Sequence, residues 1–179
     1  MNIITLGRGN IGGGLGRRWQ QSGHKVTFFG RDGGDASTAD VVLVAVPPGS
    51  ISDALTQVIG LEGKVAVDAT NAFGGRDDTY ESLAHEVKVH TKGPVAKAFN
   101  ANYANLFDRI DDQRVAPGCL YAAEEEAREI AQTLIRDAGY EPEYVGGLDS
   151  ARALEDFAIN VLTKIAPPVF YRFAPPGEL

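Results

Sequence analysis

Short apolar runs alternate with segments of helical spacing along the whole chain. Apolar runs bounded by glycine, proline or polar residues predict strands. They cover residues 3–6, 25–29, 41–46, 65–69, 95–99, 116–123 and 143–145, with a weaker candidate at 87–89. Apolar residues at helical spacing predict helices over residues 11–21, 50–59, 79–85, 102–107, 124–138 and 150–166. This alternation is typical of a doubly wound, mostly parallel sheet with helices on both faces, so we expect one three-layer α/β domain over residues 1–179.

One crossover departs from this alternation. Residues 32–39 (DGGDASTA) are too few and too rich in glycine for a full helix. We therefore expect a loop or a turn between the second and third predicted strands.

The last predicted helix is amphipathic. Its apolar positions are Leu154, Phe157, Ala158, Val161, Leu162 and Ile165. Asp149 or Ser150 caps it, and Pro167 and Pro168 end it. The tail that follows is too apolar to remain loose in water, since it contains Phe170, Tyr171 and Phe173. Helix and tail either cover the last edge of the sheet, or form a homodimer interface or one wall of a substrate pocket.

Composition and charge limit the classes of binding partner and the cellular compartment that we expect. The formal net charge of -7 opposes binding to nucleic acid and to anionic membranes. Cys119 is the only cysteine, which excludes an internal disulfide and suits a reducing compartment; we expect it to be buried in a strand. The N-terminus lacks the pattern of a signal peptide, and no apolar stretch is long enough to span a membrane. These features predict a cytoplasmic protein.

A glycine pattern lies between the first predicted strand and the first predicted helix. Gly7, Gly9 and Gly12 form GxGxxG within the sequence GRGNIG. In this context the first glycine permits a tight turn, the second lets a pyrophosphate approach, and the third lets helix and strand pack closely. Three further glycines follow at Gly13, Gly14 and Gly16. Each weakens a helix, so a cofactor or a strand must come close there. We expect a Rossmann-type site for a nicotinamide dinucleotide, with phosphates at the helix N-terminus.

The end of the second strand indicates which dinucleotide is bound. NAD-binding domains usually place an acid there, whereas this chain has Gly30 followed by Arg31. Arginine matches a phosphate and keeps its charge, and Arg8 in the glycine loop adds a second cation. Asp32 remains an alternative ligand of the ribose hydroxyl. We favour NADP(H).

A substrate is expected at the carboxyl ends of the central strands. The residues there are Val46, Pro47, Pro48, Thr70, Asn71, Phe99 and Asn100. The prolines offer a rigid apolar wall for a nicotinamide. The asparagines either bind a carboxamide or a substrate carbonyl, or satisfy their own turns.

Acid–base groups are scarce around this expected cleft. His24, His85 and His90 lie away from it, and strand alternation points Lys97 to the face opposite Ala98 and Asn100. We therefore predict no catalytic side chain and no metal ligand. Hydride transfer between planar cofactors requires neither, because the cofactors carry the chemistry.

Several segments together resemble the coenzyme F-420-dependent NADP oxidoreductase family. They are the glycine loop at residues 7–12, Gly30 with Arg31, the sequence VAVP at residues 44–47, and GLDSARALE at residues 147–155. The resemblance implies NADP(H) bound by the glycine loop, with Arg31 at the 2′-phosphate. It also implies a second planar cofactor, coenzyme F-420 or a flavin, against the nicotinamide, and a homodimer through the C-terminal helix.

Two features depart from that family. Arg8 stands where the family usually has a small or hydroxylated residue, and the crossover after Arg31 is shortened. Two functions remain: an NADP(H)-dependent oxidoreductase acting on a deazaflavin or flavin-like acceptor, or a non-catalytic NADP(H)-binding module that senses redox state. The predicted site comprises Gly7, Arg8, Gly9, Asn10, Ile11, Gly12, Gly30, Arg31, Val46, Pro47, Pro48, Asn71, Ala98 and Asn100.

Overall fold

Seven strands form one sheet in the computed structural model, which describes residues 1–177. Their order is β2 (Lys25–Phe29), β1 (Asn2–Leu6), β4 (Val41–Val44), β6 (Val65–Asp68), β7 (Val95–Lys97), β8 (Gly118–Ala123) and β9 (Glu141–Gly146). Neighbouring strands are parallel except for β7 and β8, which are antiparallel. The strand order reverses at β1, which lies between β2 and β4. This arrangement confirms the predicted α/β fold with a mostly parallel, doubly wound sheet.

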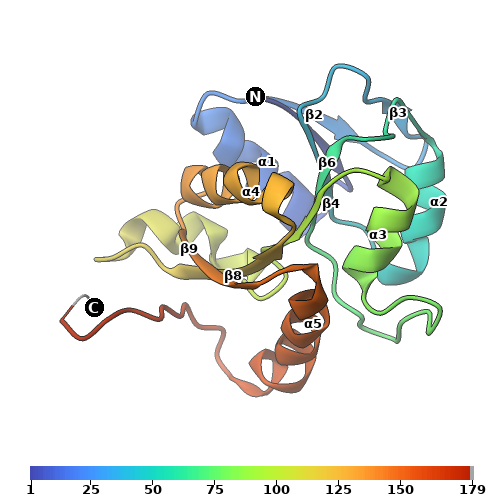
Figure 1. Cartoon of the computed structure of the whole chain (residues 1–179). Coiled ribbons are helices and arrows are strands. Elements are labelled where there is room, and N and C mark those ends of the chain that lie inside the picture. The colour runs from blue at the N-terminus through green and yellow to red at the C-terminus, as the bar shows by residue number, and fades with distance from the viewer. Residues whose placement is uncertain (178–179) are drawn as a thin grey trace.

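Helices cover both faces of the sheet (Figure 1). On one face lie α1 (Asn10–Gln21) and α4 (Glu125–Asp137), and on the other α2 (Ile51–Thr56) and α3 (Leu83–Thr91). The fifth helix, α5 (Ala151–Asn160), packs against β8 and α3. Four short 3₁₀ helices complete the described elements: η1 (Pro48–Ser50), η2 (Ala104–Asp112), η3 (Leu148–Ser150) and η4 (Leu162–Lys164). None of the helices within residues 1–177 has the length and apolar character needed to cross a membrane.

The glycines of α1 let that helix approach its neighbours. A Cβ on Gly14 would stand 2.4 Å from the ring of Phe107 in η2, and one on Gly16 would stand 2.4 Å from the ring of Phe28 in β2. Leu15 and Trp19 of the same helix are fully buried. The close approach expected for Gly14 and Gly16 is therefore made by aromatic side chains of the protein itself.

The predicted helix at 79–85 and the strand candidate at 87–89 are both wrong, because α3 occupies Leu83–Thr91. Ser82 begins this helix, since its hydroxyl accepts from the backbone N–H of His85 at 3.2 Å. The valines that suggested a strand lie on opposite sides of the helix: Val87 is fully buried and Val89 is 57% exposed.

Two other helices are shorter than predicted. The helix expected to reach residue 59 ends at Thr56, and β5 (Val58–Ile59) pairs there with β3 (Gly34–Asp35). This pairing fixes the crossover at residues 32–39, which has no helix, as expected. The last helix ends at Asn160 and continues as η4, so Ile165 lies beyond both.

The apolar tail lies along β8 and β9. The carbonyl of Tyr171 accepts from the N–H of Gly118 at 2.6 Å, and its hydroxyl accepts from the N–H of Leu120 at 3.2 Å. The N–H of Phe173 donates to Oε1 of Glu143 at 2.8 Å. The N–H groups of Gly118 and Leu120 lie outside the short stretch of β8 that pairs with β7. The tail thus covers this open part of β8.

Candidate functional site

The glycine loop turns tightly between β1 and α1. Gly7 has φ +100°, and a Cβ there would stand 2.2 Å from the carbonyl oxygen of Ala45. A Cβ on Gly12 would stand 2.2 Å from the carbonyl oxygen of Gly7. Gly9 differs, because nothing lies within 4 Å of its missing Cβ. The backbone itself therefore requires Gly7 and Gly12, whereas Gly9 presents an open approach to the start of α1.

The N-terminus of α1 carries no side-chain cap. The first N–H groups of a helix have no partner within the helix, and the helix dipole favours negative charge beside them. No acidic residue occupies the first turn of α1. The arrangement can accept a phosphate group.

A cavity of about 830 Å³, here called the larger cavity, opens beside the glycine loop. Seven predicted site residues line it: Gly7, Arg8, Gly9, Gly30, Arg31, Val46 and Pro47. The alternative ligand Asp32 lines it too. Its remaining polar lining residues were not predicted as part of the site; they are Ser50, Asp53 and Gln57 around α2.

Two arginines give the larger cavity its positive charge. Arg8 extends from the glycine loop to the tip of β2, where its Nη2 would be 3.1 Å from a Cβ on Gly30. Arg31 is the next residue after that glycine and lines the same cavity. Both side chains are exposed, and within residues 1–177 neither forms an ion pair or a side-chain hydrogen bond. Their donors are free to bind an anion.

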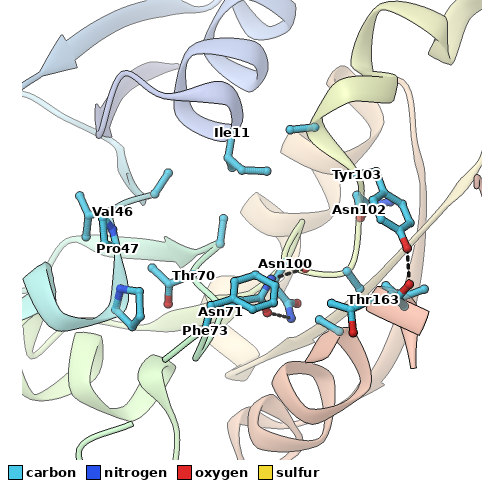
Figure 2. Close-up of a pocket in the computed structure, with 17 residues that line it drawn as sticks. Ile11, Val46, Pro47, Thr70, Asn71, Phe73, Asn100, Asn102, Tyr103 and Thr163 are labelled. Carbon is cyan, nitrogen blue, oxygen red and sulfur yellow. Dashed lines mark hydrogen bonds between the residues drawn. The ribbon is translucent and has the colours of Figure 1, made fainter. Parts of the chain in front are cut away.

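A second cavity of about 320 Å³, the smaller cavity, adjoins the larger one and shares Ala45, Val46 and Pro47 with it (Figure 2). Six predicted site residues line it: Ile11, Val46, Pro47, Pro48, Asn71 and Asn100. Thr70, also expected at this edge of the sheet, lines it too. Further lining residues were not predicted; those with polar or aromatic groups are Phe73, Asn102, Tyr103 and Thr163. The last helix also forms one wall, through Ala158 and Leu162.

Asn71 and Asn100 bind each other across the smaller cavity. Nδ2 of Asn71 donates to the carbonyl of Asn100 at 2.7 Å, and Nδ2 of Asn100 donates to Oδ1 of Asn71 at 3.0 Å. Nδ2 of Asn100 also donates to the carbonyl of Leu154 in α5, at 3.0 Å. These asparagines join the ends of β6 and β7 to the last helix, rather than only satisfying their own turns.

Three polar atoms of lining residues lack a hydrogen-bond partner within the described chain. They are Oγ1 of Thr70, Oδ1 of Asn100 and Oδ1 of Asn102. Thr70 is 3% exposed and Asn100 is 5% exposed. An unpaired buried polar atom costs free energy, and these three atoms are shielded from solvent, so the cost is borne within the fold.

Titratable groups are sparse around the smaller cavity. Within the part of the chain that the structure describes, Tyr103 is the one titratable residue in its lining, and its hydroxyl donates to the carbonyl of Leu162. His24 lies elsewhere, with Nε2 2.7 Å from Oδ2 of Asp137. His85 and His90 lie on α3.

Three predicted site residues line neither cavity. Asn10 is exposed at the start of α1, and Gly12 is buried where that helix packs on the glycine loop. Ala98 is fully buried in the core beside α1 and α4. Strand alternation placed Ala98 near the cleft, but the chain turns at Phe99, which has φ +63°.

Comparison with known proteins defines the fold. No protein-family model matches the sequence, and no curated protein matches it. A protein from Arthrobacter sp. FB24, provisionally assigned as an F-420-dependent NADP reductase, superposes with a TM-score of 0.75 over 90% of this chain and 91% of its own, at 21% identity. A hypothetical protein from Sinorhizobium meliloti superposes with a TM-score of 0.68 over 84% of this chain and 87% of its own, at 26% identity.

Larger reductases contain the same fold. A reductive aminase from Aspergillus terreus, solved in complex with NADPH, superposes with a TM-score of 0.66 at 13% identity. The match covers 91% of this chain but 60% of the aminase, so this chain spans less than two thirds of that enzyme. These reductases share the fold of this chain. The resemblance inferred from the sequence thus holds at the level of the fold.

Proposed function

We propose that the protein is an NADP(H)-dependent oxidoreductase that exchanges hydride with coenzyme F-420 or a flavin-like acceptor. The observation that carries this proposal is the pair of adjoining cavities. One has two unpaired arginines, the other has apolar walls with the amide side chains of Asn71 and Asn100, and both meet at Ala45, Val46 and Pro47. A dinucleotide is a ligand with one highly charged half and one neutral planar half, so it matches this pair.

The larger cavity suits the phosphate-bearing half of NADP(H). Gly9 and the uncapped start of α1 would hold the pyrophosphate. Arg8 and Arg31 would hold the 2′-phosphate, because guanidinium groups bind phosphate through charge-assisted hydrogen bonds. The acids Asp32 and Asp53 line the same cavity, and the first of them is the competing ligand for a ribose hydroxyl.

The smaller cavity suits the nicotinamide and a second planar ring. Bound NADPH supplies the hydride. Pro47 and Pro48 present apolar surface without N–H groups, and Asn71 and Asn100 in the same lining carry amide groups suited to a carboxamide. The apolar walls exclude water from the reacting rings, and the backbone around them fixes their orientation.

The position of the tail favours an enzyme over a non-catalytic sensor. A sensor that signals through its tail would be expected to fill the smaller cavity with Phe170 or Tyr171. Neither residue lines that cavity, and Tyr171 is bonded to β8 instead. The cavity is left open to a second substrate.

A single experiment tests the activity. NADPH-loaded protein is mixed anaerobically in a stopped-flow instrument with deazaflavin, flavin and quinone acceptors, and NADPH oxidation is followed by absorbance. We expect the deazaflavin or a flavin to be reduced fastest. Tight binding of NADPH with no oxidation by any acceptor would contradict the enzyme and support the sensor.

A further inference from the structure

A cluster of buried charges adjoins the smaller cavity. Lys97 of β7 has no exposed surface, and its Nζ donates to Oδ2 of Asp68 at 2.7 Å and to the carbonyl of Thr70 at 2.6 Å. Its third partner is Oε1 of Glu155, at 2.9 Å. The side chains of Asp68 and Glu155 are also 0% exposed. Buried ion pairs rarely stabilise a fold more than apolar residues of similar size, so the cluster calls for a reason other than stability.

Glu155 of α5 joins four segments of the chain. Besides the lysine of β7, Oε1 accepts from the backbone N–H of Leu83, at the start of α3, at 2.9 Å. Oε2 accepts from Nε of Arg76, in the loop after β6, at 2.7 Å. Arg76 also donates from Nη2 to Oδ1 of Asp156 at 2.7 Å. One buried carboxylate therefore holds α5, β7, α3 and this loop against one another.

These segments carry walls of the smaller cavity (Figure 2). The loop after β6 supplies Asn71 and Phe73, and α5 supplies Ala158. The carbonyl of Leu154, directly before Glu155, accepts from the lining residue Asn100 at 3.0 Å. None of the four charged residues Asp68, Arg76, Lys97 and Glu155 lines either cavity. The cluster thus contacts residues that shape the smaller cavity, but its charged side chains would not touch a ligand bound there.

The loop after β6 depends on Arg76 for its position. Gly74 and Gly75 have φ of 93° and 117°, and a Cβ on either would meet nothing within 4 Å, so the chain packs little there. Phe73 is 57% exposed at the cavity. Arg76 ties the far side of these glycines to α5 through two carboxylates.

We infer that Glu155 is a positioning residue that sets the wall of the acceptor pocket by holding the Phe73 loop, α5 and β7 in one arrangement. This inference rests on the proposed function. It also gives a physical role to the end of the segment at residues 147–155, one of the segments that carry the family resemblance. The larger cavity, proposed for the phosphate-bearing half of NADP(H), contains none of these segments, so we expect the affinity for NADPH to depend little on Glu155.

The test uses Glu155→Gln in the full chain. Both carboxylate oxygens accept from donors, so an amide places its NH₂ group against a donor in either orientation. Arg76→Ala is the second variant, because it releases the loop and leaves Glu155 paired with Lys97. Glu124→Gln is the matched control: Glu124 accepts from Lys88 and from the N–H of Val95 but lines neither cavity.

Three quantities are measured for each variant: the Kd of NADPH, the steady-state parameters for the acceptor, and amide hydrogen exchange by mass spectrometry. In Glu155→Gln and Arg76→Ala we expect faster exchange in residues 71–82 and a loss in acceptor kcat/KM of about tenfold or more, since small misplacements at a reacting pair are costly. The Kd of NADPH should stay within about twofold of wild type, because the site of the dinucleotide phosphates is untouched.

Each outcome supports or overturns the positioning role of Glu155. Unchanged exchange in residues 71–82 overturns the positioning role whatever the kinetics. A parallel loss of NADPH affinity, or the same kinetic loss in Glu124→Gln, also overturns it, because the effect would then be general destabilisation. A wild type that reduces no acceptor overturns the proposed function, and the exchange result then decides alone whether Glu155 holds the loop.

Discussion

The guanidinium of Arg8 lies against the Cα of Gly30, so that a Cβ on this glycine would stand 3.1 Å from Nη2 and 3.3 Å from Cζ. Glycine at the end of β2 thus gives an arginine of the first loop room to reach the strand tip. The two residues together explain why this chain tolerates a large cation in the glycine loop. Arg8 and Arg31 then face one cavity with no acidic partner of their own among residues 1–177.

Replacing Arg31 by alanine tests the cofactor preference. If Arg31 binds the 2′-phosphate, a charge-assisted hydrogen bond is lost, and NADPH should bind about 10- to 100-fold more weakly. NADH has no such phosphate, so its affinity should change little. Added salt should weaken NADPH binding to the wild type in the same direction. Titration calorimetry with both cofactors measures these effects.

Arg17→Ala is the control for the loss of a positive charge, because Arg17 is exposed on α1 and lines neither cavity. Equal weakening of NADPH and NADH in Arg31→Ala would assign Arg31 to the adenine or to the fold. A wild type that prefers NADH would instead assign the ribose hydroxyl to Asp32.

Replacing Gly9 by alanine tests the pyrophosphate site. Nothing lies within 4 Å of the new methyl group and the backbone φ of -72° suits alanine, so the protein should fold normally. The methyl group would occupy the approach of the pyrophosphate, and NADPH binding should be abolished. Gly147→Ala is a matched control, since its Cβ also meets nothing within 4 Å and it lies outside both cavities. Unchanged NADPH affinity in Gly9→Ala, measured by calorimetry, would remove the site from this loop.

Replacing Ile165 by aspartate tests the homodimer. Leu154, Ala158 and Leu162 are buried within the chain, whereas Val161 is 43% exposed and Ile165 is 40% exposed. If the segment after α5 that contains Val161 and Ile165 forms the interface, the aspartate should convert a dimer into a monomer, because an unpaired charge is costly there. Light scattering measures the mass, and NADPH affinity should be retained. A wild type that is monomeric at working concentrations would refute the interface.

The fold could be predicted from the sequence wherever the local pattern of apolar residues and glycines determines the structure. β4 is four buried apolar residues in a row, as expected for a central parallel strand, and the glycine loop requires Gly7 and Gly12 for reasons of backbone geometry alone. The pattern failed at α3, where two valines two residues apart suggested a strand. A helix puts such residues on different sides, and only the position of Ser82 as a cap identifies its start.

The smaller cavity was predicted less completely, because its residues depend on contacts between distant segments. Glu155 accepts hydrogen bonds from Arg76 and Leu83, which are 79 and 72 residues away in the sequence. The local spacing of apolar and polar residues does not predict such contacts. The hydroxyl of Thr70 and the amide of Asn102 matter because their atoms lack partners once the chain is folded. Their residue types alone gave no sign of this.

The carboxyl of Glu143 on β9 holds the tail by accepting from the N–H of Phe173. Burial raises the pKa of the Glu143 carboxyl above its ordinary 4.5, although the N–H of Phe173 and the charge of Arg172 oppose the shift. A carboxyl whose pKa is raised in the folded state stabilises the fold at pH below its unfolded pKa, and this contribution is lost as pH rises through the folded pKa.

Glu143→Gln can still accept from Phe173 but cannot ionise, so it should be at least as stable as wild type at neutral pH, with an advantage that shrinks as pH falls towards 4.5. Thermal midpoints of both proteins from about pH 5 to about pH 8 measure the difference. A wild type that gains stability over Glu143→Gln as pH rises would mean that the ionised carboxylate, and not the protonated acid, holds the tail.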